Sequence, residues 1–338
     1  MDIREIARRA KVSHSTVSRV INNVPTVDPK LAKRVLKVIE QVGYRPNFQA
    51  RALARGRSNT VGLIVSEISG GNPFFAEIIL YFERAAVQHG YEVLISFADT
   101  ETDPQHIAVC AERMKERQVE GIAVLTFGME KSLAHIDHSG LPMIYAGADS
   151  DIAGVRNIRI NYVSGMRDAV KHLSEFGHTR IGYLSGNLNW SSMSMRYAAL
   201  RKAMRLVGIP LQEDVVAECN HTLEGGAGGM ANLLNIPNPP TAVMCCNDMA
   251  AIGALKTLSR RGLRVSRDIS LIGFDDLSLC DFTEPSLSTI RFSPREIATL
   301  SFEALLDSIQ QNGILRDYEY KTRFVLREST GRPKNGNS

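Results

Sequence analysis

Residues 12–22 read VSHSTVSRVIN and carry the most informative pattern in the chain. Val17, Val20 and Ile21 follow helical spacing, and Ser13 precedes them as an N-cap residue. The preceding residues contain a second short apolar face of the same spacing, which ends just before Ser13. Two short helices joined by a tight turn are typical of a helix-turn-helix.

A third helix is expected directly after this pair. Asp28 is a good N-cap, and Pro29 suits the first helical position. The apolar side chains that follow share one face: Leu31, Val35, Leu36, Ile39 and Val42. Three such helices can share a small core, so residues 1–46 are predicted to form a helix-turn-helix headpiece.

Positive charge is concentrated at the front of the chain. Residues 1–60 hold thirteen Lys/Arg and four Asp/Glu, a net charge of +9; since the whole chain carries +4, the remainder carries −5. A surface of this kind binds a polyanion with steep salt dependence, whereas the acidic remainder is repelled by DNA. Charge alone is also compatible with a solvated basic face.

Residues 12–22, together with GYRPN at 43–47, resemble the lactose/galactose repressor family. The resemblance implies that the second helix lies in the major groove of double-stranded DNA, with His14, Ser15 and Arg19 facing base edges. An arginine fork can contact O6 and N7 of guanine together, which discriminates against a wrong base by about 1–3 kcal/mol. Phosphate contacts are implied for Ser13, Thr16, Ser18 and Asn22, with helix capping and solvation as the alternative.

One position departs from the family pattern. Lys11 stands in the turn where the family usually has glycine. A lysine can adopt the turn at some cost in strain, or contact a phosphate.

Residues 47–59 are predicted to be a hinge helix and linker. The sequence PNFQARALARG at 46–56 has an N-cap, a body rich in small residues and a glycine stop. Such a short helix is only marginally stable in isolation. The resemblance implies that it pairs with the same segment of a second subunit. Asn47, Ala50 and Leu53 would then contact the minor groove, with Leu53 wedged between base steps. The alternative is an ordinary linker.

From Val61 onward, short apolar runs alternate with helical stretches, which predicts α/β architecture with parallel sheets covered on both faces. This alternation of apolar runs and helical stretches starts again near Asn161, so two lobes are expected. Their fold resembles the two-lobed sugar-binding fold that the family shares with periplasmic binding proteins. The predicted effector-binding and dimerisation domain spans 60–330, with lobe one at about 60–160 plus 290–318, lobe two at about 161–289 plus 319–330, and a polar tail at 331–338.

Candidate effector-binding residues lie just past the predicted strand ends, where ligands of such folds bind. Carboxylate, amide and guanidinium groups recognise hydroxyls, and an aromatic face covers the apolar side of a sugar. The resemblance implies such roles for Arg196, Asn247 and Asp275. Trp190 and His221 are candidates for the aromatic face, and the first lobe adds the candidates Ser69, Phe75 and Asp149. For Asp248 and Asp276, helix capping is favoured over ligand contact. Two departures from the family pattern, a longer loop at 67–73 and Asn161 in place of a usual aspartate, are expected at the pocket. The expected effector is a sugar, polyol or related metabolite.

The five cysteines lack metal-ligand spacing and are expected to be reduced packing residues, and neither a metal nor a cofactor is expected. No stretch reaches the 18 or so apolar residues of a membrane span, and no export signal precedes the charged start, so a cytoplasmic location and no membrane partner are expected.

Two rival functions fit the sequence less well. An enzyme is suggested by GAGGMA at 226–231, which formally matches a dinucleotide fingerprint, but no apolar strand directly precedes it, and glycine tolerance at a helix start is favoured. A transport binding protein would explain the two lobes but not the basic front end. A non-enzymatic transcription regulator explains both; it would bind a near-palindromic DNA operator as a homodimer under control of a small-molecule effector.

Overall fold

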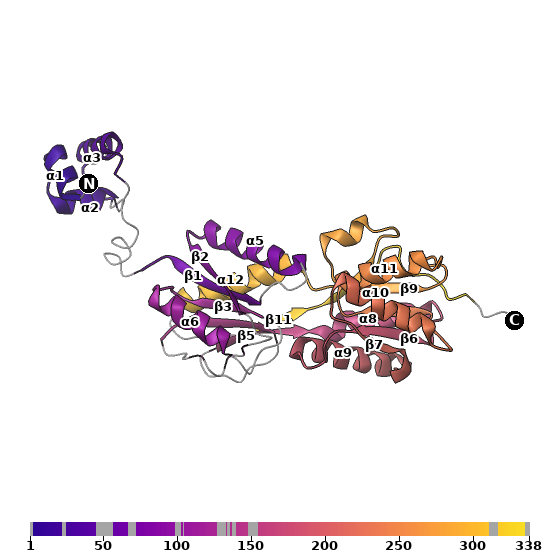
Figure 1. Ribbon diagram of the computed structural model, residues 1–338. Coiled ribbons are helices and arrows are strands. Elements are labelled where there is room, and N and C mark those ends of the chain that lie inside the picture. The colour runs from indigo at the N-terminus through magenta and orange to yellow at the C-terminus, as the bar shows by residue number, and fades with distance from the viewer. Residues whose placement is uncertain are drawn as a thin grey trace. The chain divides into compact units, whose positions relative to one another are not determined.

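The computed structural model describes residues 3–21, 25–44, 57–66, 72–98, 103, 105–126, 133, 136, 140–147, 155–310 and 317–334. The chain divides into two compact units, 1–59 and 60–338 (Figure 1). Within the described ranges, no helix combines the length and apolar character needed to cross a bilayer.

The first unit is the expected three-helix headpiece, formed by α1 (Ile3–Ala10), α2 (His14–Ile21) and α3 (Pro29–Val42). Its core contains one cluster of buried side chains: Ile6, Ala7, Ala10, Val17, Val20 and Val35. Asp28 caps α3 as predicted, because its carboxylate accepts hydrogen bonds from the backbone amides of Lys30 and Leu31 at 2.9 and 3.1 Å. The placement of Leu36 in the core is wrong, since its side chain is 53% exposed.

The turn between α1 and α2 contains the lysine that departs from the family pattern. Lys11 adopts φ = 47°, a left-handed conformation that glycine enters without strain. Its carbonyl accepts a hydrogen bond of 3.3 Å from Arg34 of α3. Ser13 caps α2 as predicted, because its Oγ accepts from the Thr16 amide at 3.1 Å.

The described residues of the second unit form two six-stranded sheets. The first sheet is entirely parallel and has the order β11 (Tyr318–Lys321), β5 (Val155–Asn161), β4 (Met143–Gly147), β3 (Ile122–Leu125), β1 (Thr60–Ser66) and β2 (Glu92–Ala98). The second has the order β12 (Arg323–Val325), β10 (Ser288–Arg291), β9 (Ser270–Asp275), β8 (Ala242–Cys245), β6 (Ile181–Ser185) and β7 (Val216–Glu218). Only β12 runs antiparallel to its neighbour. The predicted parallel sheets are confirmed.

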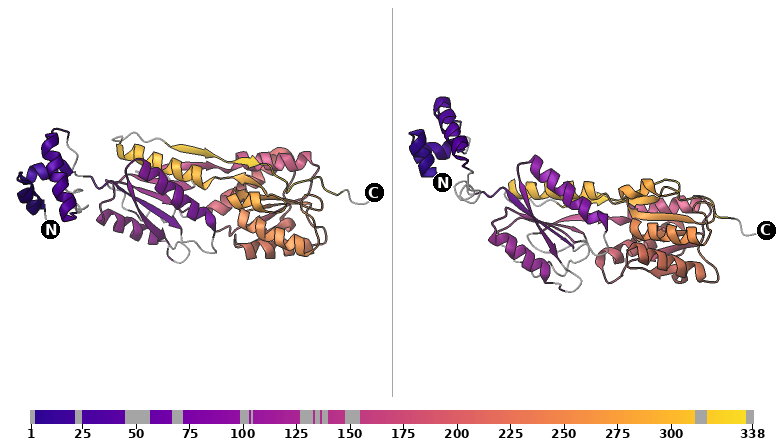
Figure 2. Two further views of the ribbon diagram at one scale, coloured as in Figure 1. Left: turned by 90° about the horizontal axis from the view of Figure 1, so that it is seen from above. Right: turned by 45° about the horizontal axis from the view of Figure 1, so that its top comes forward.

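Helices cover both faces of each sheet (Figure 2). In the first lobe, α5 (Pro73–Gln88) and α12 (Pro294–Gln310) pack side by side on one face, and α6 (His106–Glu116) covers the other. In the second lobe, α8 (Tyr162–Glu175) packs with α9 (Ser191–Val207), and α10 (Leu223–Asn235) packs with α11 (Asp248–Arg260). Two short 3₁₀ helices, η2 (Glu213–Val215) and η3 (Ser278–Phe282), complete the second lobe.

The chain passes between the two sheets three times, after β5, after β10 and between β11 and β12. The predicted lobe boundaries at 289/290 and 318/319 therefore need correction, because they cut through β10 and β11. The whole of β10 belongs to the second sheet, and the whole of β11 belongs to the first.

Gly226 of α10 and Gly253 of α11 allow these two helices to pack closely. An added Cβ on Gly226 would lie 2.0 Å from the carbonyl oxygen of Ala250 in α11, and one on Gly253 would lie 1.9 Å from that of Leu223. Gly226 lies inside α10 rather than in a loop after a strand. Close helix packing therefore explains Gly226, the first glycine of the formal dinucleotide-fingerprint match; the sequence alone did not reveal this contact.

Gly226→Ala is expected to lower the free energy of unfolding by about 1–3 kcal/mol or more, because the opposing atoms are backbone and cannot rotate away. Gly228→Ala is the matched control: the position is in the same helix with nothing within 4 Å of an added Cβ. There, alanine should raise stability by up to about 1 kcal/mol. Denaturant unfolding measures both, and equal changes at the two positions would contradict the packing role.

A buried histidine holds the C-terminal segment against the second lobe. His178 Nε2 lies 2.8 Å from the carbonyl oxygen of Gly331, to which it donates, and Nδ1 lies 2.8 Å from the Thr241 hydroxyl. Burial lowers the pKa of His178, and the nearby His172 acts in the same direction. The folded protein therefore favours the neutral ring.

A folded-state pKa below the unfolded value gives stability that is present above about pH 6.5 and is lost as pH falls. Below about pH 6.5, the unfolding free energy of the wild type should therefore fall relative to that of His178→Gln, by up to about 1.4 kcal/mol per pH unit. The comparison must be between variants, because buried Asp248, whose pKa is raised to about 6, acts with the opposite sign. His14→Gln, which changes an exposed histidine of the headpiece, is the control. Parallel curves for wild type and His178→Gln would refute the assignment.

Candidate functional site

The centre of the candidate effector site is Arg196, which α9 presents toward the ends of the second-lobe strands. Its guanidinium donates from Nη1 to the carbonyl oxygen of Cys246 at 2.6 Å and from Nη2 to Oδ1 of Asp275 at 3.1 Å. The carbon Cζ lies 3.9 Å from the ring centroid of Phe274. The side chain is buried, and Nε has no hydrogen-bond partner among the described residues. An unmatched buried donor is costly, so a ligand acceptor at Nε would be strongly favoured.

Asp275 ends β9 in an unusual backbone conformation, with φ = 114°. Burial raises the pKa of its carboxyl group to about 8, although the guanidinium of Arg196 acts to lower it. The pKa of this carboxyl group therefore lies close to neutral pH, as is common for titratable groups at functional sites.

Asn247 follows β8 and connects two walls of the site. Its Oδ1 caps α11 by accepting from the Ala250 amide at 2.8 Å, and its Nδ2 donates to the carbonyl oxygen of His221 at 2.8 Å. The sequence interpretation gave this side chain a ligand contact. The structure gives it a capping and bridging role, in which the amide positions the His221 segment.

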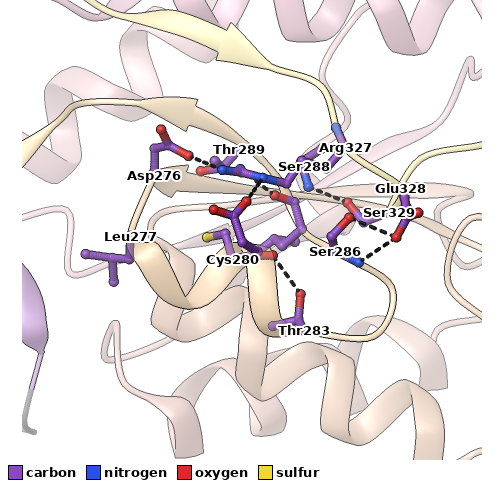
Figure 3. A network of polar contacts seen from close by, with 12 residues as sticks. Asp276, Leu277, Cys280, Thr283, Ser286, Ser288, Thr289, Arg327, Glu328 and Ser329 are labelled. Atoms are coloured by element: carbon purple, nitrogen blue, oxygen red, sulfur yellow. Dashed lines mark hydrogen bonds and ion pairs between the residues drawn. The ribbon is translucent and has the colours of Figure 1, made fainter.

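The expectation that Asp248 and Asp276 are helix caps is wrong. The buried Asp248 carboxylate accepts from Thr289 Oγ1 at 2.6 Å and from the Leu277 amide at 2.8 Å. Asp276 forms one ion pair with Arg291. It forms a second with Arg327 at 2.8 Å, and both of these residues are drawn in Figure 3. Both carboxylates belong to a network that joins η3, β10 and the segment after β12.

Trp190 and His221 form an aromatic pair at the site. Their ring centroids are 4.6 Å apart at an interplanar angle of 47°. Burial and the charge of Arg196 lower the pKa of His221, and Nδ1 is buried with no partner among the described residues. The pair therefore offers two tilted aromatic ring faces and a nitrogen that can bond a ligand.

The first-lobe candidates are only partly described. Phe75 is half-buried and packs edge-on against Phe74, which in turn stacks on Phe292 at 5.4 Å. Ser69 and Asp149 lie outside the described residues. Sequence reasoning missed two aromatic neighbours of Arg196, Phe274 in β9 and Phe292 directly after β10.

The expectation that Asn161 touches the effector pocket needs correction. Its side chain caps α8 through the Ser164 amide at 3.3 Å and donates to Glu319 at 3.0 Å. It lines a separate cavity of about 590 Å³, which contains none of the candidate effector residues; the walls include Tyr162, Met195 and Lys202.

The candidate DNA-contacting residues lie on α2 and just before it. His14, Ser15 and Arg19 are exposed, as base-reading residues must be. Ser13 and Thr16 share a hydroxyl contact of 2.9 Å in addition to the helix cap, and Ser18 is half-buried. Asn22 and the hinge residues Asn47, Ala50 and Leu53 lie outside the described residues. No group of metal ligands occurs in the described parts of the chain.

Comparisons with known proteins agree with both units. Residues 2–47 match the family described as bacterial regulatory proteins, lacI family, and residues 170–330 match a periplasmic binding protein-like domain.

Among full-length relatives, the probable HTH-type transcriptional repressor ExuR of Bacillus subtilis is 32% identical over 97% of this chain and 99% of its own. The HTH-type transcriptional repressor CytR of Escherichia coli K12 is 34% identical over 91% of this chain and 89% of its own.

Solved structures with the same fold include the lac repressor dimer bound to operator and the anti-inducer ONPF, with a TM-score of 0.88 and 25% identity over 98% of this chain and 99% of that one. The complex of the transcriptional regulator CelR with cellobiose has a TM-score of 0.70 and 25% identity over 97% and 99% of the two chains. With a helix-turn-helix headpiece, two parallel-sheet lobes and full-length repressor relatives above 30% identity, this chain belongs to the LacI family of bacterial transcription regulators.

Proposed function

We propose that this regulator represses transcription in the cytoplasm by binding a near-palindromic operator as a homodimer, and that a sugar or related hydroxyl-rich metabolite bound beside Arg196 changes its operator affinity. The protein acts by binding alone and catalyses no reaction. The observation that carries the effector part is the buried Arg196–Asp275 pair, which keeps an unmatched guanidinium donor next to the Trp190–His221 rings.

DNA binding is supported by the headpiece surface. His14, Ser15 and Arg19 are exposed on the second helix, and the first 60 residues carry a net charge of +9. The positive charge would provide salt-dependent attraction to phosphates, and the α2 side chains would provide base recognition. A two-fold dimer would place two such helices one DNA turn apart.

Effector binding is supported by the chemistry of the second-lobe site. Asp275 can accept hydrogen bonds from ligand hydroxyls, Arg196 Nε can donate to a ligand oxygen, and Trp190 can cover an apolar ring face. Because Arg196 also holds the backbone after β8, ligand contact there would bias the arrangement of several strand ends at once. Coupling to DNA would then run through the hinge segment at 47–59.

The decisive experiment measures binding of the full chain to immobilised DNA from its gene's upstream region, at two salt concentrations and with a panel of sugars and nucleosides. Specific, salt-sensitive binding to a near-palindrome that one compound strengthens or weakens is the expected result. Random DNA of equal length is the control. Equal affinity for both DNAs in all conditions would refute operator recognition, and operator binding that no hydroxyl-rich compound alters would refute the effector assignment.

A further inference from the structure

Two buried thiols meet beneath the candidate effector site. Cys219 follows β7 and Cys246 follows β8, on either side of the end of β6. Their sulfur atoms are 3.8 Å apart, and both thiols are free. The sequence predicts packing roles for all five cysteines, and it gives no sign that these two, 27 positions apart, come together.

The two thiols have different surroundings. The hydrogen bond between the two thiols lowers the pKa of Cys219 and raises that of Cys246, and burial raises the pKa of Cys246 further. Cys219 is also slightly exposed, at 6%, whereas Cys246 is fully buried. A thiol that ionises more readily and is closer to solvent, next to a second thiol, is the arrangement of a peroxide-reactive pair.

We propose that hydroperoxides oxidise Cys219 and Cys246 to a disulfide, which makes the effector site redox-sensitive. The Cys219 thiolate attacks one peroxide oxygen to give a sulfenic acid and releases the other oxygen as water, or as an alcohol from an organic hydroperoxide. The Cys246 thiol then attacks Cys219 Sγ, forms the S–S bond and releases a second water. Two thiols are oxidised to one disulfide, and one peroxide is reduced. The regulatory meaning of this step rests on the proposed function.

The bridge would distort the walls of the site. The sulfurs must approach from 3.8 Å to about 2.05 Å, and in addition to side-chain rotation we expect the two strand ends to move toward each other. The carbonyl of Cys246 holds Arg196, and His221, two residues after Cys219, packs against Trp190. Bridging should therefore shift both the guanidinium anchor and the aromatic pair.

The first test maps the bond in the wild-type protein. The native full chain is treated with hydrogen peroxide, quenched with N-ethylmaleimide, unfolded and digested. We expect the five thiols of the reduced chain to fall to three, with a linked peptide whose fragmentation separates Cys245 from Cys246. Five alkylated thiols, or a bridge to Cys245 or Cys280, would overturn the proposal without any variant having to fold.

The second test follows Trp190, the only tryptophan of the chain. Peroxide should change its emission in the wild type, and dithiothreitol should reverse the change. Cys219→Ala and Cys246→Ala should each abolish the response, whereas Cys110→Ala, which changes a buried cysteine of the first lobe, should keep it. A response that survives both variants would overturn the proposal. Neither test uses an effector, so a bridged protein that ignores every compound would refute only the proposed effector site.

Discussion

Replacing Arg196 with methionine is expected to lower the free energy of unfolding of the second unit by about 3–5 kcal/mol at pH 9 and to abolish effector binding. The change would leave the Asp275 carboxylate, which is 3% exposed, without its counter-charge. Burial raises the pKa of Asp275 to about 8 even beside Arg196, which acts to lower it, so the carboxyl of the variant takes up a proton still more readily as pH falls. The loss should therefore be smaller at pH 6 than at pH 9.

Denaturant unfolding at the two pH values measures this effect. Arg205→Met makes the same substitution at an exposed position of the same helix and should change stability little. Adding Asp275→Asn to Arg196→Met should restore part of the loss at pH 9, because no buried charge remains. If Arg205→Met were as damaging, or if the loss did not depend on pH, the buried ion pair would not explain the effect.

Arg19→Ala is expected to reduce the ratio of operator to random-DNA affinity by about 1–3 kcal/mol for each half-site, so both half-sites together would lose roughly 2–6 kcal/mol. The reason is that the guanidinium is exposed on α2, where it can read a guanine edge, while non-specific attraction comes from the rest of the basic surface.

Competition binding with operator and random duplexes at one salt concentration measures the ratio. Ser18→Ala is the control, since loss of a phosphate contact should weaken binding to both DNAs alike. An unchanged ratio for Arg19→Ala would remove this residue from the set of base-reading residues.

The sequence predicts most of the central strands and the edge strand β2, but it misses the other three edge strands and the inner strands β5 and β10. Strands such as β3, β8 and β9 are buried throughout, so they appear as continuous apolar runs. The missed strands β7, β11 and β12 lie at sheet edges, where one side meets solvent and three or four residues suffice. β5, with the sequence VRNIRIN, places polar side chains among its apolar ones, and no apolar run marks it.

Within the site, residue types were easier to predict than roles. Arg196 and Asp275 were expected at the site, and the structure brings them together. The cap of α11 was assigned to Asp248 and belongs to Asn247, because a shift of one residue in the start of α11 decides which side chain caps the helix. The contacts of Asp248 and Asp276 involve residues 15 to 51 positions away, and helical or strand spacing carries no information about such pairs.

The three crossings of the chain between the sheets also determine the order in which the two sheets can be completed during synthesis. β11 and β12 supply an edge of each sheet, yet they leave the ribosome after every other strand. The headpiece can fold as soon as its three helices have emerged, whereas β5 lacks its outer neighbour until residue 321 is synthesised and β10 lacks its outer neighbour until residue 325 is synthesised. During that interval these two inner strands are unpaired along one side, so the pairing of β11 and β12 is the last step that shields them from contact with other chains.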